Sequence, residues 1–216
     1  MATANDAMTG GTLQSTANNV IATANNGAIT GIEVIAATTA ELAATTDIAD
    51  ATVSAGTNAM ITATETISNS TINAATADLD AANINGGTIT LSGMADLTAT
   101  AGISGVNIDT DAIAQFRGTA DITDISITAA STDIQAATIR GGTLAVAGTA
   151  DITATADIQD ITIGAGNADI AAVNVLDSTI ATDTTAMLTA ATNITGGTIS
   201  SGGDATLTAT NGKIDG

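Results

Sequence analysis

An internal repeat constrains the fold of this sequence more than any other feature. Apolar residues return at near-regular intervals, the shortest being 17 residues, from Ile72 to Ile89, and the longest 21, from Leu13 to Val34. The first series of these anchors is Leu13, Val34, Val53, Ile72, Ile89, Ile108, Ile127, Leu144, Ile163, Ile180 and Ile199. A repeat of this period predicts a solenoid, because each unit buries its apolar face only against its neighbours.

Two further apolar series run in step with the first. The second is Ile21, Leu42, Ile61, Leu79, Leu97, Phe116, Ile134, Ile152, Ile170, Leu188 and Leu207. The third is Ile29, Ile48, Ile67, Ile84, Ile103, Ile122, Ile139, Ile158, Val175, Ile194 and Ile214. Each coil therefore has three anchors. The interval from a third anchor to the next first anchor is constant, so changes of coil length fall in the other two intervals.

A column of corner residues stands two positions after the third anchors. Its members are all Gly, Asn or Asp: Gly31, Asp50, Asn69, Gly86, Gly105, Asp124, Gly141, Asp160, Asp177, Gly196 and Gly216. These residue types tolerate the left-handed backbone region. The column predicts one tight corner per coil.

The segments around the second anchors have the period of a β-strand. Ala stands two residues before and two residues after most of these anchors, as Ala40 and Ala44 do around Leu42. A period of two puts the anchors and the alanines on one face, and Thr, Asp, Asn and Ser on the other. The abundant Ala is compatible with helix, but dense Thr and the lack of a sustained 3.6 period favour strands.

These patterns predict an all-β fold, a right-handed parallel β-helix (β-solenoid). We expect about eleven coils of 17 to 21 residues, with three parallel sheets along the axis. Residues 1–9 are expected to form an N-terminal lead, and residues 10–216 a single repeat domain. With strands about 4.8 Å apart, the rod would be roughly 50 Å long.

The charge and the missing side chains exclude several functions. The chain has 22 acidic residues against three basic ones and lacks Cys, His, Trp and Tyr, with Phe116 its only aromatic residue. A nucleic-acid backbone would be repelled. The side chains of most catalytic and cofactor sites are missing, so the sequence predicts a protein that is not an enzyme and has no cofactor. A carboxylate pair such as Asp109 and Asp111 is the remaining acid–base candidate.

Three segments carry a family resemblance. GGTISSGGDATLTATNGKI (196–214), GGTLAVAGTADITATADI (141–158) and GGTITLSGMADLTATAGI (86–103) resemble the repeats of filamentous haemagglutinin and related exoproteins of bacterial two-partner secretion. The resemblance covers nearly the whole chain. It implies a β-helical stalk of a secreted or cell-surface adhesin. The chain departs from that family in showing no signal peptide and no evident secretion domain, and no membrane insertion is expected.

An acidic column precedes the second anchors. It contains Asp78 and Asp96 on adjacent coils and Asp133, Asp151 and Asp169 on three consecutive coils. Like charges about 4.8 Å apart in water repel by roughly 0.9 kcal/mol per neighbouring pair. This carboxylate ladder is either a weak Ca²⁺ site, because calcium accepts several carboxylate oxygens, or a solvated acidic face that keeps the rod soluble.

A hydroxyl-rich column precedes the first anchors. It is Thr52, Thr71, Thr88, Asn107, Ser126, Thr143, Thr162, Thr179 and Thr198. Such a rank on a flat solenoid face suggests ice binding, whereas the simpler interpretation is β-branched residues stacked on a sheet. The second rank on the same face is mixed: Ser54, Asn73, Thr90, Asp109, Thr128, Ala145 and Gly164.

The sequence therefore predicts a structural or adhesive stalk segment, extracellular or at a cell surface. Its partners would be host or neighbouring cell surfaces, met through a longer parent chain. Neither end shows a polar cap, and this suggests an alternative, a subunit that stacks end to end on copies of itself in a filament. A Thr-face ice-binding protein is the third hypothesis.

Overall fold

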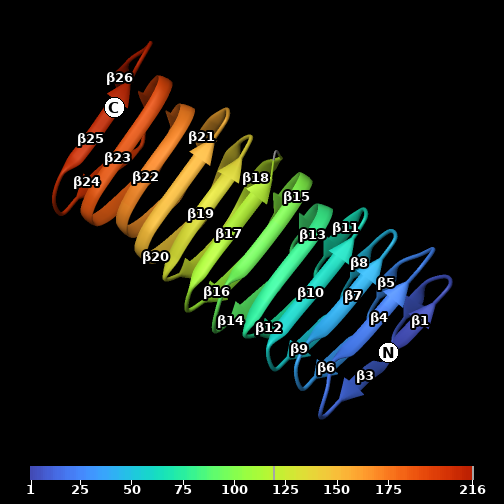
Figure 1. Cartoon of the computed structure of the whole chain (residues 1–216). Helices are drawn as coiled ribbons and strands as arrows, with labels where there is room; N and C mark the ends of the chain where they lie inside the picture. Colours follow the sequence, from blue (N-terminus) through green and yellow to red (C-terminus); the bar gives the residue numbers. More distant parts are fainter. Residues whose placement is uncertain (119, 216) are drawn as a thin grey trace.

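The computed structural model describes residues 1–118 and 120–215 and confirms the predicted all-β solenoid of about eleven turns. The coils stack in sequence order from one end of a rod to the other, with the two termini at opposite ends (Figure 1). Each coil therefore contacts only the coils before and after it. None of the described residues forms a helix with the length and apolar character needed to cross a bilayer.

The N-terminal coils are built from short strands, one on each of three faces. We call these the first, second and third faces, after the anchor series that each contains. The strands are β1 (Ala2–Ala4), β2 (Met8–Thr9), β3 (Thr12–Ser15), β4 (Val20–Ala24), β5 (Ile29–Thr30), β6 (Glu33–Ala36), β7 (Ala40–Ala44), β8 (Ile48–Ala49), β9 (Thr52–Ala55), β10 (Asn58–Ala63), β11 (Thr66–Ser68) and β12 (Thr71–Ala74).

Several later strands continue through a corner onto the next face. The strands after β12 are β13 (Thr76–Asn85), β14 (Thr88–Leu91), β15 (Ala95–Ser104), β16 (Asn107–Thr110), β17 (Ile113–Gly118), β18 (Asp121–Ala129), β19 (Ser131–Ala136), β20 (Ile139–Ala154), β21 (Asp157–Gln159), β22 (Thr162–Leu176), β23 (Thr179–Thr195), β24 (Thr198–Ser201), β25 (Ala205–Ala209) and β26 (Ile214–Asp215). Those that span more than one face are β13, β15, β18, β20, β22 and β23. Through these corners the three faces join into one sheet, which has 26 strands over the described residues.

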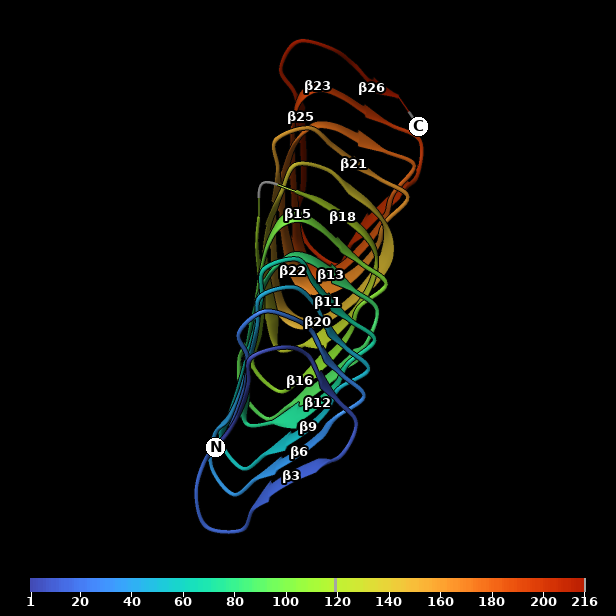
Figure 2. The same ribbon diagram turned by 90° about the vertical axis from the view of Figure 1, so that its right-hand side faces the viewer.

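The three anchor series stack in register along the rod, and Figure 2 shows the coils lying over one another. Ile72 pairs with Ile89 on the first face, and Ile103 with Ile122 on the third. Phe116 pairs with both Leu97 and Ile134 on the second face and is fully buried. The core therefore accommodates its one aromatic side chain without a change of register.

Changes of coil length fall where the anchor spacing predicts them. Register shifts occur between Val146 and Thr149 and between Ala81 and Asn83, each in an interval between two anchors. Such bulges add or remove a residue without moving the flanking inward side chains. The ladder then resumes in register on the next face.

The corner column adopts the predicted left-handed conformation at each of its members up to residue 196; Gly216 lies outside the described residues. The five Asx members have φ between 47° and 56°, and the Gly members between 60° and 68°. At some corners a second Gly follows. Gly142 has φ 100°, and a Cβ there would lie 2.3 Å from the carbonyl oxygen of Ile125 on the preceding coil. Only glycine fits this position.

The structure corrects the second series at its first member. Ala22, and not Ile21, pairs with Leu42, while Ile21 pairs with the exposed Glu41. Val20, Ala22 and Ala24 are buried, and Ile21 is only half-buried. Because a slip of one residue would turn three inward side chains to solvent, the alternation outweighs the size of the single Ile.

The expected lead also differs from the structure. Within residues 1–9, β1 pairs with β4 and β2 pairs with β5, so the ladder extends to Ala2. Met8 stacks on Ile29 in the third column, and Gly10 has the left-handed φ of a corner, 65°. The pattern escapes notice in the sequence because the second-anchor position of this coil is filled by the small residue Ala2, which pairs with Ala22.

Candidate functional site

The acidic column forms the predicted ladder on the second face. Asp78 pairs with Asp96, and Asp133 pairs with Asp151, which pairs in turn with Asp169. These side chains lie on the outward side of β13, β15, β19, β20 and β22, between inward residues such as Ala150 and Ile152. The strand period therefore places one carboxylate per coil in a line along the rod.

The ladder has two parts because Gln115 separates them. Gln115 pairs with Asp96 on one side and with Asp133 on the other. Its Nε2 donates a hydrogen bond of 3.1 Å to Oδ2 of Asp133. The amide therefore neutralises one contact in a row that would otherwise be carboxylates alone. Beyond its ends the column continues with Met60 and Met187.

Two carboxyl groups in the ladder hold their protons more strongly than usual. Partial burial raises the pKa of Asp151 above its ordinary value of 3.8, and the charges of Asp133 and Asp169 add to the effect. Partial burial also raises the pKa of Asp78, with contributions from Asp96 and Asp80. Both shifts reflect the cost of a charge that lacks a compensating cation.

The ladder does not gather into a ligand cage. Over residues 1–118 and 120–215, no three acidic side chains converge closely enough to hold a metal ion. One carboxylate oxygen, Oδ1 of Asp96, is buried and has no hydrogen-bond partner within that part of the chain. Calcium binding at the ladder remains a prediction from the sequence.

The hydroxyl-rich column lies on the first face in the predicted register. Thr71 pairs with Thr52 and Thr88, and Thr162 pairs with Thr143 and Thr179. All nine members of the column are exposed. The second rank is as mixed as the sequence predicts, and over its C-terminal part the small residues Ala145, Gly164 and Ala181 leave a shallow depression. Among the described residues lining this depression, Asp183 is the only titratable one.

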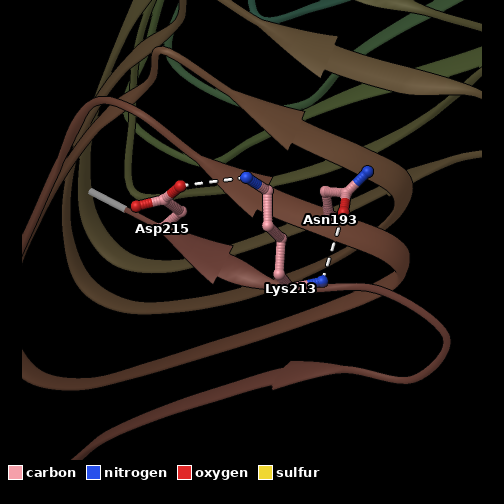
Figure 3. Close-up of polar contacts among 3 residues, drawn as sticks. All are labelled: Asn193, Lys213 and Asp215. Atoms are coloured by element: carbon pink, nitrogen blue, oxygen red, sulfur yellow. Dashed lines mark hydrogen bonds and ion pairs between the residues drawn. The ribbon is translucent and has the colours of Figure 1, made fainter.

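A third ladder, on the third face, was not identified from the sequence. It occupies the position before the third anchors. Nδ2 of Asn174 donates to Oδ1 of Asp157 at 2.7 Å, and Nδ2 of Asn193 donates to Oδ1 of Asn174 at 3.2 Å. The backbone amide of Lys213 then donates to Oδ1 of Asn193 at 3.2 Å (Figure 3).

This amide ladder was detectable in principle. Once the third anchors are aligned, the residues before them are polar on most coils: Asp47, Thr66, Asn83, Asp121, Thr138, Asp157, Asn174 and Asn193. Side-chain amides both donate and accept, so they stack along a solenoid without the repulsion of carboxylates. Lys213 ends the described part of the ladder with an exposed ion pair of 3.0 Å to Asp215.

Comparisons of the chain with protein-family models, with curated proteins and with solved structures gave no match.

Proposed function

We propose that this chain is a structural, adhesive stalk segment of a secreted or surface-exposed bacterial exoprotein. The observation that carries the proposal is the continuity of the three anchor columns, which run in register from the first described coil to the last. Because hydrogen bonds between coils lie along the axis, separating two coils means breaking three short ladders together. A rod of this kind transmits load and keeps its ends apart.

The surface chemistry supports a stalk in an aqueous environment. The formal net charge is −19, and the outward columns consist largely of Thr, Asp, Asn and Ser. Excess charge of one sign keeps such rods dispersed and limits non-specific contact with other acidic surfaces. Among the large apolar side chains that are exposed, Met60, Met94, Ile113 and Met187 are 42 to 45% exposed, so more than half of the surface of each is covered.

Single-molecule force spectroscopy tests the stalk. The chain is placed between two marker domains of known unfolding force and pulled from its ends. We expect a folded rod about 50 Å long that resists extension and then lengthens in steps corresponding to one or a few coils. Extension at negligible force would contradict the proposal.

The adhesive part of the proposal is tested by the retention of chain-coated beads on cells. The comparison is with beads that carry an unfolded chain of equal charge.

A second candidate function is a filament built by end-to-end stacking. Within the described residues, the outer edges of β24, β25 and β26 have no partner strand, and Ile214 is 51% exposed. Ile199 and Leu207 on the same coil are only partly buried, as are Met8 and Leu13 at the other end. Such edges pair either with further coils of a longer chain or with a second copy.

Negative-stain microscopy at increasing concentration, with and without calcium, separates these two cases. Filaments with a repeat of about 50 Å would support stacking. In that case Ile214→Asp should abolish them, whereas Met187→Asp, at a side position of similar exposure (45%), should not. Isolated rods in all conditions would leave the stalk as the better account, and dependence of assembly on calcium would support a cation on the carboxylate ladder.

A further inference from the structure

The chain contains three Asn-Gly pairs whose backbone amides differ in their hydrogen bonding. They are Asn26-Gly27, Asn85-Gly86 and Asn211-Gly212. Asn-Gly is the dipeptide in which a backbone nitrogen most easily reaches the side-chain carbonyl carbon of the preceding residue, because glycine has no Cβ to hinder the approach. The three asparagines are all exposed. Solvent exposure therefore does not distinguish them.

One pair is held in the ladder. The Gly86 amide donates a hydrogen bond of 2.7 Å to the carbonyl oxygen of Ser104, and Oγ of Ser104 donates to Oδ1 of Asn85 at 2.9 Å. Asn85 lies in β13, paired with the next coil at Ser104. The nitrogen that would have to attack is therefore engaged, and it lies between strand residue Asn85 and the left-handed corner at Gly86, whose φ is 67°.

The other two pairs lie outside strands, at bends between the second and third faces. Within the described part of the chain, the amides of Gly27 and Gly212 make no hydrogen bond. Asn211 is held only through its own backbone amide and Nδ2, which donate to the carbonyl oxygen of Ala191 at 3.0 and 3.3 Å. Both glycine nitrogens are thus available as nucleophiles.

We propose that Asn26 and Asn211 are sites of spontaneous deamidation and that the ladder protects Asn85. At each site the glycine nitrogen loses its proton to hydroxide and attacks Cγ of the asparagine, so that an N–Cγ bond forms. The Cγ–Nδ2 bond breaks, and the amide nitrogen leaves as ammonia with a proton from water. Water then opens the five-membered succinimide at either carbonyl, giving aspartate or isoaspartate. Each event adds one negative charge to a chain that already carries −19.

The test follows the three asparagines separately by peptide mapping and mass spectrometry after incubation of the folded chain at mildly alkaline pH. We expect Asn26 and Asn211 to react at least tenfold faster than Asn85, which corresponds to about 1.4 kcal/mol for opening the ladder at Gly86. In denaturant the three rates should become similar. Equal rates in the folded chain, or a slow Asn85 in denaturant as well, would overturn the proposal.

Two variants serve as controls. Asn26→Gln should abolish reaction at residue 26 and leave Asn211 unchanged, because the longer side chain forms a six-membered ring far more slowly. Gly27→Ala is unsuitable, since its Cβ would lie 2.8 Å from the Ala7 nitrogen. Ser104→Ala removes the bond to Asn85 Oδ1 but keeps the backbone bond to Gly86, so Asn85 should remain protected. Rapid reaction of Asn85 in this variant would refute protection by the backbone.

Discussion

Asp151 lies at the centre of the longest run of carboxylates, so its neutralisation is the most direct test of the ladder's energetics. It pairs with Asp133 on one side and with Asp169 on the other. Replacing Asp151 with Asn keeps the shape of the side chain and removes both repulsions together. We therefore expect Asp151→Asn to stabilise the solenoid at pH 7.

The size of the effect follows from the spacing of the coils. Two unit charges about 4.8 Å apart in water repel by roughly 0.9 kcal/mol. At 0.15 M salt the Debye length of about 8 Å reduces this by nearly half. Two pairs then give about 1 kcal/mol, a value already discounted for the solvent exposure of these groups. In a chain of this size, that corresponds to a rise in Tm of roughly 2 to 4 °C.

The assay is thermal or urea unfolding followed by circular dichroism, at low and at high salt. Asp109→Asn is the matched control, because Asp109 is exposed and its ladder neighbours are Thr90 and Thr128. It should change the free energy of unfolding by less than about 0.5 kcal/mol. Equal effects of the two substitutions, or a gain for Asp151→Asn that persists in 1 M salt, where the Debye length is about 3 Å, would refute the electrostatic reasoning.

The raised pKa of Asp151 also predicts how the free energy of unfolding changes with pH. Because the pKa of Asp151 is raised in the folded state, the folded chain binds the proton more strongly than the unfolded chain. The free energy of unfolding should therefore fall as pH rises from 3.8 through the raised pKa, and the wild type should be more stable in mild acid than at pH 7. Asp151→Asn should reduce this gain, while Asp78 retains its own share. Unfolding curves at several pH values check the sign.

Four further substitutions test the corner, the core and the break in the ladder. Gly142→Ala should lower the free energy of unfolding by at least about 1 to 3 kcal/mol, because φ is 100° there and a carbonyl oxygen would lie 2.3 Å from the new Cβ. Its control is Gly105→Asn, at a corner position that other coils fill with Asp or Asn, which should cost less than about 1 kcal/mol. Phe116→Ala should cost about 3 to 5 kcal/mol in urea unfolding, because the ring is fully buried. Gln115→Glu should lower Tm at neutral pH but not in acid, because it replaces a hydrogen bond to Asp133 with a like charge.

Most of the fold was predictable because each coil of a parallel solenoid repeats the same pattern of inward apolar residues and left-handed corners. At the corners, residue type predicts the backbone conformation: Asp50 and Asn69 have the positive φ that Asp and Asn tolerate. Ile21 shows the limit of the approach. Choosing the largest apolar residue as the anchor was wrong by one position, since the pairing of Ala22 with Leu42 depends on the whole alternation of the strand.

The candidate sites were predictable to different degrees. The register of the carboxylate ladder follows from the anchor alignment, but the hydrogen bond from Gln115 to Asp133 depends on rotamers that no sequence pattern reports. The amide ladder through Asn174 and Asn193 was missed because Asp, Asn and Thr share this column and no single residue type fills most of it. Its detection requires grouping residues by hydrogen-bonding capacity and not by identity.

The resetting of register at each coil has a consequence for how such a chain changes in evolution. A bulge between Val146 and Thr149 absorbs a length difference before the next face begins. The strand edges of each coil therefore lie in register with those of the next coil. Duplicating or removing a whole coil would alter the length of the rod by about 4.8 Å and leave the backbone ladders of the other coils in register. The length of such a rod can thus change by whole coils without a change of fold.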